Sequence, residues 1–168
     1  STANTKHAYL ILAHANPFVL DRLLRLLDDE RNDIYIHVDL KAKDFNTDNF
    51  VGITRNAKTV FIERMEVYWG HVSQIQVELR LFRSAFESGT YAYYHLISGG
   101  DLPLQSQDDI HRFFQKHSGK EFLGFSQATF DKERIDKIHL FSKNMRASEH
   151  QYSLRLQRKI RNLFVSLQ

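Results

Sequence analysis

Short runs of apolar residues punctuate the first 125 residues of this chain, and polar residues follow the end of each run. The runs are AYLILA (8–13), DIYIHV (33–38), TVFI (59–62), YAYYHLIS (91–98) and EFLGF (121–125). Short continuous runs rich in β-branched and aromatic residues are typical of strands that are covered on both faces. The pattern therefore predicts five strands.

Between these runs, apolar residues recur at spacings of three and four, which predicts helices. The predicted helices cover residues 17–29, 70–88 and 106–119. Their boundaries are marked by Asn16 as an N-cap, Pro17 at the first helical position, Gly89 as a C-terminal stop, and a capping box of Ser106 with Asp109. Strands that alternate with helices predict an α/β fold with a mainly parallel sheet flanked by helices.

The second of these helices takes its spacing from five apolar residues: Val72, Ile75, Leu79, Phe82 and Phe86. Between the second and third strands, residues 40–58 are polar and contain a glycine, so they predict a loop with at most one helical turn.

The end of the chain reads as a basic amphipathic helix over residues 150–168. Its apolar side comprises Leu156, Ile160, Leu163, Phe164 and Leu167. We expect this side to pack against its own domain or another chain. Peripheral membrane contact through residues 152–167 is the alternative, because basic amphipathic helices can lie on anionic membranes. Between residue 125 and this helix the pattern does not distinguish strand from helix.

Length and composition are those of an ordinary folded domain. The chain has 168 residues, of which 42% are hydrophobic and 26% are charged, and we expect one domain over residues 1–168. No run of 18 apolar residues is present in the sequence, so it predicts no transmembrane helix. The absence of cysteine rules out disulfides, thiolate metal sites and a cysteine nucleophile, and it favours a reducing compartment, the cytoplasm. With 23 Lys and Arg against 20 Asp and Glu, and no nucleic-acid motif, we expect no nucleic-acid partner.

Polar side chains stand at the end of each predicted strand. The first strand ends at His14, the second at Asp39 and the third at Glu63, and the fourth is followed by a glycine pair and Asp101. The carboxyl ends of parallel strands share one edge of the sheet, and ligands bind there. Three fingerprints are absent: G-x-G-x-x-G, the P-loop and G-x-S-x-G. Dinucleotide oxidoreductases, P-loop kinases and serine hydrolases are therefore not favoured.

Four segments in the same order resemble one family. LDRLLRLL, IYIHVDLKA, EVYWGHVSQIQVEL and YYHLISGGDLPL are similar to the core-2/I-branching glycosyltransferases, which include β-1,6-N-acetylglucosaminyltransferases and peptide O-xylosyltransferases. The resemblance implies a GT-A-like, Rossmann-related fold. It also implies an inverting, metal-independent transfer of N-acetylglucosamine or xylose from a UDP-sugar to a glycan or another hydroxyl acceptor. No cofactor beyond the UDP-sugar donor is implied.

The same resemblance sets a limit on what this chain does. In the family, the general base is a carboxylate in a later segment, and the basic residues that neutralise the diphosphate lie there too. Nothing after Phe125 matches that segment. We therefore expect the N-terminal, nucleotide-sugar-binding portion of an incomplete GT-A domain, which lacks the catalytic base and has no assigned catalytic residue.

The resemblance also assigns the nucleotide-binding residues. Asp39 and Lys41, in HVDLK, match the nucleotide-side motif, in which the carboxylate accepts from ribose hydroxyls or the uracil edge. A solvated turn is the alternative for Asp39. His14 is the next candidate for a nucleotide contact. Tyr68 and Trp69, in EVYWGH, could stack on the base or line the sugar pocket, or could simply pack in the core.

Residues 99–101 are the candidate substrate-binding turn. Gly99 and Gly100 would allow close backbone approach to a ligand. Asp101 has two open roles: accepting from backbone N–H groups in its turn, or facing sugar hydroxyls. Metal-using relatives of the fold carry D-x-D here. A single carboxylate binds a hard cation only weakly. This favours stabilisation of the leaving diphosphate by Lys or Arg rather than by a metal ion.

Two other functions remain open. One is a metal-dependent hydrolase that would use His14, His37, Asp39 and Asp101, although His37 lies within a strand and is better explained as a core histidine. The other is a non-catalytic module that binds nucleotide-sugars or glycans. For the transferase, we expect a role in bacterial polysaccharide biosynthesis, in the cytoplasm or at the inner face of the membrane.

Overall fold

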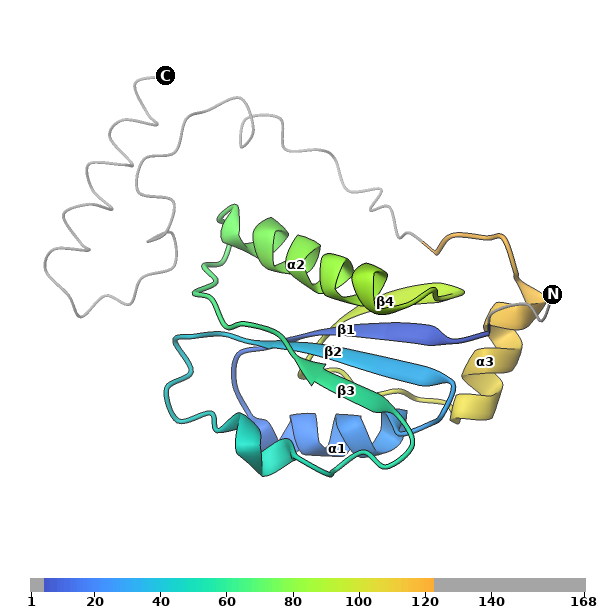
Figure 1. Ribbon diagram of the computed structural model, residues 1–168, viewed down its shortest axis with the longest axis horizontal. Coiled ribbons are helices and arrows are strands. Elements are labelled where there is room, and N and C mark those ends of the chain that lie inside the picture. Colours follow the sequence, from blue (N-terminus) through green and yellow to red (C-terminus); the bar gives the residue numbers. More distant parts are fainter. Residues whose placement is uncertain (1–4, 123–168) are drawn as a thin grey trace, which may run out of the picture. The chain divides into compact units, whose positions relative to one another are not determined.

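The computed structural model describes residues 5–122 and shows a parallel sheet between helices (Figure 1). Its elements are β1 (His7–Ala13), α1 (Pro17–Leu27), β2 (Asn32–Val38), the 3-10 helix η1 (Thr47–Phe50), β3 (Lys58–Phe61), α2 (Ser73–Ser88), β4 (Tyr93–Ser98) and α3 (Gln107–Lys116). The strand order is β3-β2-β1-β4, and each neighbouring pair is parallel. The predicted α/β class is confirmed, as are four of the five strands.

The chain divides into two compact units. The first contains residues 1–67 and 75–120, and the second contains residues 68–74 and 121–168. All four strands lie in the first unit. Most of the predicted fifth strand and the whole predicted helix at 150–168 lie outside the described residues, and the expectation of a single domain stays a prediction. In the part of the chain that is described, no helix is long and apolar enough to cross a membrane.

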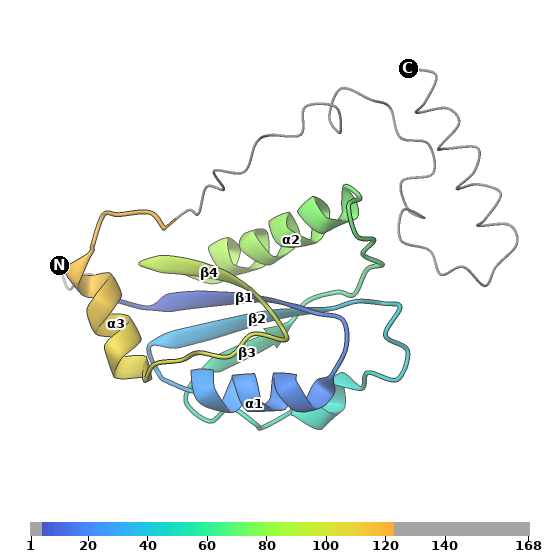
Figure 2. The same cartoon turned by 180° about the vertical axis from the view of Figure 1, so that it is seen from behind.

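The two central strands are covered on both faces, which explains their continuous apolar runs. Side chains alternate along β2, so that Ile34 and Ile36 pack with α1 on one face while Tyr35 packs with α2 on the other. Figures 1 and 2 show the two helices on opposite faces of the sheet. The register aligns Ala13 with Val38, so β1 and β2 end side by side.

Helix α1 forms as its sequence predicts. Asn16 is the N-cap, in the left-handed region with φ 58°, and its side-chain oxygen accepts from the backbone N–H of Val19 at 3.4 Å. The helix buries one leucine stripe completely, comprising Leu20, Leu23, Leu24 and Leu27. It ends at Leu27, two residues earlier than expected, because the backbone of the C-cap residue Asp28 leaves the helical region, with ψ 84°.

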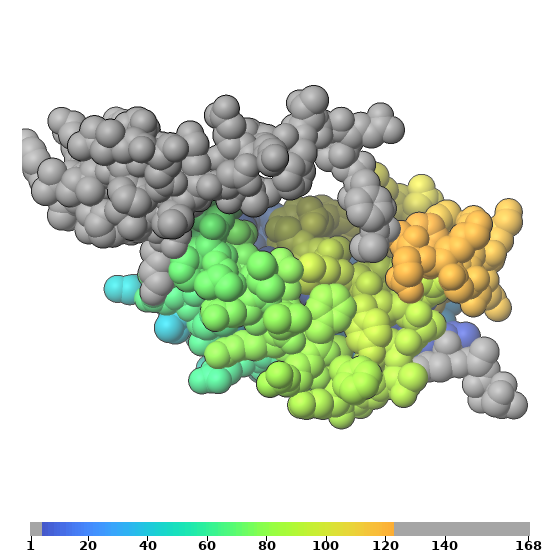
Figure 3. Space-filling model, turned by 90° about the horizontal axis from the view of Figure 1, so that it is seen from above, coloured from blue at the N-terminus to red at the C-terminus, as the bar shows by residue number. Residues whose placement is uncertain are grey.

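Helix α2 buries a different side from the one that its spacing suggested. Val77, Leu81 and Ala85 are fully buried against the sheet. Leu79 and Phe86 are 63% and 77% exposed, although they belong to the stripe from which the helix was predicted. Apolar residues occupy two sides of this helix, so periodicity identifies the helix but does not select its buried face. Figure 3 looks onto the α2 and β4 side of the molecule.

Helix α3 lies at the amino-terminal ends of the strands (Figure 1). It contributes His111 to a cluster of imidazoles. Its predicted cap is confirmed, since Ser106 Oγ accepts from the backbone N–H of Asp109 at 3.2 Å. The rings of His7 and His111 are stacked with centroids 4.1 Å apart. A ring nitrogen of His95 lies 3.0 Å from one of His7. His111 also bonds Asn32, which anchors the helix to β2.

Burial keeps this imidazole cluster neutral. Desolvation, followed by the neighbouring His111, lowers the pKa of His7 to about 3 and that of His95 to about 4. The charges of His95 and then Arg31 also contribute to this low pKa of His7. Histidines in an unfolded chain titrate near 6.5, so below that pH the unfolded state binds more protons than the folded state. The stability from these groups is therefore complete above about pH 6.5 and is lost as the pH falls towards 4.

We predict that the free energy of unfolding decreases between pH 6.5 and 4.5, and that His95→Phe makes this decrease shallower. Removing one titrating group lowers the slope by up to ~1.4 kcal/mol per pH unit. Urea denaturation at a series of pH values measures both slopes. His117→Phe is the control, since this half-buried histidine lies at the C-cap of α3, outside the cluster. Equal slopes for the parent and His95→Phe would contradict the prediction.

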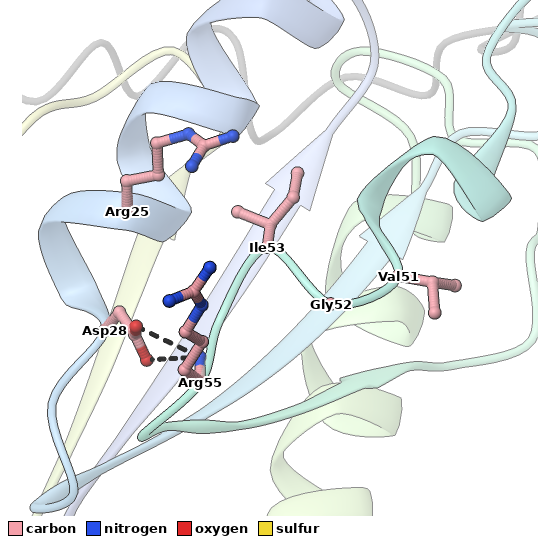
Figure 4. A pocket seen from close by; sticks show the side chains of 6 residues that line it. All are labelled: Arg25, Asp28, Val51, Gly52, Ile53 and Arg55. Atoms are coloured by element: carbon pink, nitrogen blue, oxygen red, sulfur yellow. Dashed lines mark hydrogen bonds between the residues drawn. The ribbon is translucent and has the colours of Figure 1, made fainter.

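The loop before β3 is held to the end of α1 by a single carboxylate. Asp28 Oδ1 accepts from the backbone N–H groups of Arg55, Asn56 and Ala57 at 3.0, 2.8 and 2.8 Å. Figure 4 shows the hydrogen bonds from the backbone N–H of Arg55 to the Asp28 carboxylate. Both residues line an open hollow of about 530 Å³, together with Arg25 and Ile53. The hollow lies near the start of β3, at the opposite edge of the sheet from the predicted site.

We predict that Asp28→Ala lowers the free energy of unfolding by about 1–3 kcal/mol, because it leaves three backbone N–H groups without their acceptor. Asp21→Ala removes a carboxylate from the same helix but breaks only the exposed pair with Arg25, so it should cost less than about 0.5 kcal/mol. Urea denaturation of both variants measures the difference, and similar losses would show that Asp28 has no special role.

Candidate functional site at the carboxyl edge of the sheet

Three of the strands bring their carboxyl ends to one edge of the sheet, as predicted. The backbone N–H of Asp39 donates to the carbonyl of Ala13 at 2.8 Å, which joins the ends of β2 and β1. The backbone N–H of Gly99 donates to the carbonyl of Leu12 at 2.8 Å, which joins the ends of β4 and β1. His14, Asp39 and the 99–101 turn therefore follow neighbouring strands at the same edge.

Asp39 is buried rather than part of a solvated turn. It is 7% exposed. Its Oδ1 accepts from the backbone N–H of Lys41 at 2.9 Å and from that of Val67 at 3.5 Å. Its Oδ2 lies 3.3 Å from Lys41 Nζ. Because an ionised carboxylate has about four acceptor positions, Asp39 keeps acceptor capacity for a ligand hydroxyl.

Lys41 links the segment that follows β2 to the segment that follows β3. Its Nζ donates to the carbonyl of Val67 as well as pairing with Asp39, and its side chain is about 42% exposed. Asp39 and Lys41 of the HVDLK motif form one ion pair, and their contact with a nucleotide stays a prediction.

Arg64 belongs to this edge, although the sequence analysis did not single it out. Its guanidinium donates to the backbone carbonyls of Val38, Asp39, Ala42 and Phe45 at 3.3, 2.8, 2.7 and 3.2 Å. The available signal was its place three residues after β3 in FIERMEVYWG, and that pattern alone does not show which groups it bonds.

His37 is a core histidine, as the sequence indicated. It is 1% exposed, and its Nε2 accepts from the backbone N–H of Met65 at 3.0 Å. Burial is the largest cause that lowers its pKa, and Asp39 acts in the opposite direction. An accepting Nε2 keeps the ring neutral and ties the segment after β3 to β2.

The remaining nucleotide candidates are less fixed. His14 is exposed, and its side chain forms no hydrogen bond to the described residues. Tyr68 and Trp69 belong to the second compact unit, in which Tyr68 donates its backbone N–H to Ser73 Oγ at 2.9 Å. Trp69 is 48% exposed. Their contact with the nucleotide, together with His14 and Asp39, stays a prediction.

The 99–101 turn is tight, and its two glycines differ. A Cβ on Gly99 would lie 3.0 Å from Ala13 Cβ and 3.1 Å from Ala13 Cα, so only glycine fits beside β1. A Cβ on Gly100 would meet only Ser98 Oγ, at 3.6 Å. Asp101 Oδ2 accepts from the backbone N–H of Ser98 at 2.8 Å, which confirms the first of its two roles. Contact of Asp101 with a sugar stays a prediction.

Metal binding finds no support in this part of the chain. Within residues 5–122, no group of three or more His, Cys, Asp or Glu side chains is arranged to hold a metal ion. His37 is engaged with Met65, and Asp101 with Ser98, so the four residues of the hydrolase hypothesis do not form a ligand set. The metal-dependent hydrolase is therefore not favoured.

The order of these elements defines an α/β domain, with its polar candidate site at the carboxyl edge of a parallel sheet. A family model described as Core-2/I-Branching enzyme matches residues 7–161. The chain belongs to the core-2/I-branching enzyme family.

Relatives of this chain are named as glycosyltransferases. Xylosyltransferase 2 of Homo sapiens is 30% identical over 121 residues, which are 69% of this chain and 14% of that protein. Beta-1,3-galactosyl-O-glycosyl-glycoprotein beta-1,6-N-acetylglucosaminyltransferase of Homo sapiens is 30% identical over 129 residues, 75% of this chain and 30% of that protein. Beta-1,3-galactosyl-O-glycosyl-glycoprotein beta-1,6-N-acetylglucosaminyltransferase 4 of Danio rerio is 24% identical over 127 residues, 71% and 29% of the two lengths. The chain thus spans less than a third of these relatives.

We predict that Gly99→Ala destabilises the protein by about 1–3 kcal/mol, because the added methyl group must push β4 away from β1. Gly100→Ala is the matched control, since the added carbon makes only an ordinary contact, and it should change stability by less than about 0.5 kcal/mol. Thermal and urea denaturation measure both. A larger loss for Gly100→Ala than for Gly99→Ala would contradict this packing.

Proposed function

We propose that this chain is the donor-nucleotide portion of an inverting, metal-independent glycosyltransferase. The donor is a UDP-sugar, either UDP-N-acetylglucosamine or UDP-xylose, and the acceptor is a hydroxyl of a glycan or a similar molecule. Support comes from the family and from relatives named as xylosyl- and acetylglucosaminyltransferases.

The observation that carries the proposal is the state of Asp39. A carboxylate that is 93% buried is costly unless it is paired and hydrogen-bonded. Asp39 meets this condition through Lys41 and two backbone N–H groups, and it retains acceptor capacity at the edge where ligands of parallel sheets bind. Ribose hydroxyls and the imide N–H of uracil are donors of the kind that such a carboxylate accepts from.

The leaving diphosphate must be stabilised by positive charge. The turn after β4 offers one carboxylate, Asp101, which already accepts from Ser98, so it is a weak place for a divalent ion. In our proposal Lys or Arg side chains take this role, and Lys41 is the half-exposed cation nearest to Asp39 among the pairs described here. None of the described residues is assigned as general base.

We also propose a cytoplasmic setting in bacterial polysaccharide biosynthesis. The support is the cysteine-free sequence, which suits a reducing compartment.

We predict that the 168-residue chain binds UDP and that Asp39→Asn raises the Kd at least ~10-fold, equivalent to ~1.4 kcal/mol, because the amide loses the charge that strengthens its hydrogen bonds. Isothermal titration calorimetry with UDP, UDP-N-acetylglucosamine and UDP-xylose, each with and without EDTA, measures the affinities. We expect EDTA to change none of them.

The matched control is Asp44→Asn, which makes the same charge change at an exposed position in the same loop. It should bind UDP within about twofold of the parent. Equal losses for the two variants would remove Asp39 from the site, and loss of binding in EDTA would contradict the metal-independent mechanism. Full sugar transfer by this chain alone would contradict the assignment of the base to a later segment.

A further inference from the structure

The loop after β2 turns several carbonyl groups towards one point. The carbonyl oxygens of Val38, Asp39, Ala42 and Phe45 all accept from the guanidinium of Arg64. The two shortest bonds, 2.7 and 2.8 Å, come from the same nitrogen and reach Ala42 and Asp39. Arg64 therefore bonds the beginning, middle and end of the segment 38–45.

Converging carbonyl dipoles are stabilised by a cation or a hydrogen-bond donor at their centre. Each carbonyl oxygen carries partial negative charge, and such groups repel one another when no cation or donor lies between them. Arg64 is half-buried, and no carboxylate of the described residues lies within ion-pair distance of it. Its hydrogen bonds all go to carbonyl groups of this loop, which makes the loop conformation depend on it.

The loop held in this way carries the candidate nucleotide residues. Asp39 is itself one of the carbonyl acceptors, and Lys41 lies between the Asp39 and Ala42 acceptors. The backbone N–H of Leu40 donates to the carbonyl of Met65, next to Arg64, at 3.1 Å. A shift of the guanidinium would therefore move the backbone on both sides of the Asp39–Lys41 ion pair.

We propose that Arg64 is a positioning residue that fixes the 38–45 loop and thereby orients Asp39 and Lys41 for the donor nucleotide. This inference rests on the proposed function for the identity of the ligand. The geometry calls for arginine in particular: a planar guanidinium has five N–H donors in a rigid fork, whereas the ammonium of lysine is a compact point charge with three. Lysine at this position would keep the charge but could not span all four carbonyls.

The test compares Arg64→Met and Arg64→Lys with Arg83→Met, which removes the same charge from an exposed position on α2. Two quantities are measured on the 168-residue chain: the Kd for UDP by calorimetry, and amide hydrogen exchange in the loop and in β1. The loop reporters are the N–H groups of Ala42 and Phe45, which donate to Asp39 and Ala42 at 3.0 and 3.1 Å.

For Arg64→Met we expect at least ~10-fold weaker UDP binding, ~1.4 kcal/mol, and at least ~10-fold faster exchange at Ala42 and Phe45. Exchange in β1 should stay within about twofold of the parent, because the strand pairing is intact. Arg64→Lys should move both readouts in the same direction by a smaller factor. Arg83→Met should leave both unchanged.

Each of the other outcomes either supports or overturns the positioning role of Arg64. Unchanged UDP affinity in Arg64→Met, in a parent that binds UDP, would overturn the inference. Exchange that accelerates equally in the loop and in β1 would also overturn it, because Arg64 would then act on global stability. If the parent does not bind UDP, the proposed function fails on this chain, and hydrogen exchange alone tests the role of Arg64. Faster exchange confined to the loop of Arg64→Met would then support positioning by Arg64. Unchanged exchange would overturn it.

Discussion

The parallel pairing of β1 with β2 is the constraint on which the rest of this structure depends. Both strands are buried on both faces, so a slip of one residue in their register would turn each core side chain to the wrong side. The register therefore fixes where both strands end. Asp39 reaches the site edge because its own backbone N–H bonds Ala13, the last residue of β1.

Beyond the strands, two charged side chains at this edge, Asp39 and Arg64, are each bonded by backbone groups. N–H groups of Lys41 and Val67 point at the carboxylate of Asp39, and carbonyl groups of the same loop point at the guanidinium of Arg64. Each charge thus has backbone partners of the opposite sign. Water cannot readily replace these contacts at half-buried positions, so the loop has one favoured conformation.

The strands and helix starts could be predicted because their signals are local. Continuous apolar runs gave β1 and β2 within one residue, and the caps at Asn16 and Ser106 were read correctly. The buried side of α2 could not be predicted, since Leu79 and Leu81 are equally apolar and only the sheet selects between them. Long-range packing, rather than periodicity, made that choice.

The candidate site was predictable only in part, for the same reason. Strand ends and a family motif placed Asp39, Lys41 and the 99–101 turn at one edge. The burial of Asp39 was not predictable, because it results from the segment at Val67, which is distant in sequence. The sequence position of Arg64 did not show which groups it bonds, since its acceptors are carbonyl groups, which every residue has, and only the folded loop brings them together.

The guanidinium at the centre of the 38–45 loop occupies a place where other loops of converging carbonyl groups would bind a cation from solution. A dissociable ion in the same place would leave on dilution and exchange with other ions, whereas Arg64 is tethered through its own backbone. Its protonation is also constant, because a guanidinium stays charged at every pH that the protein survives. The shape of this loop therefore does not depend on binding an ion from the solution.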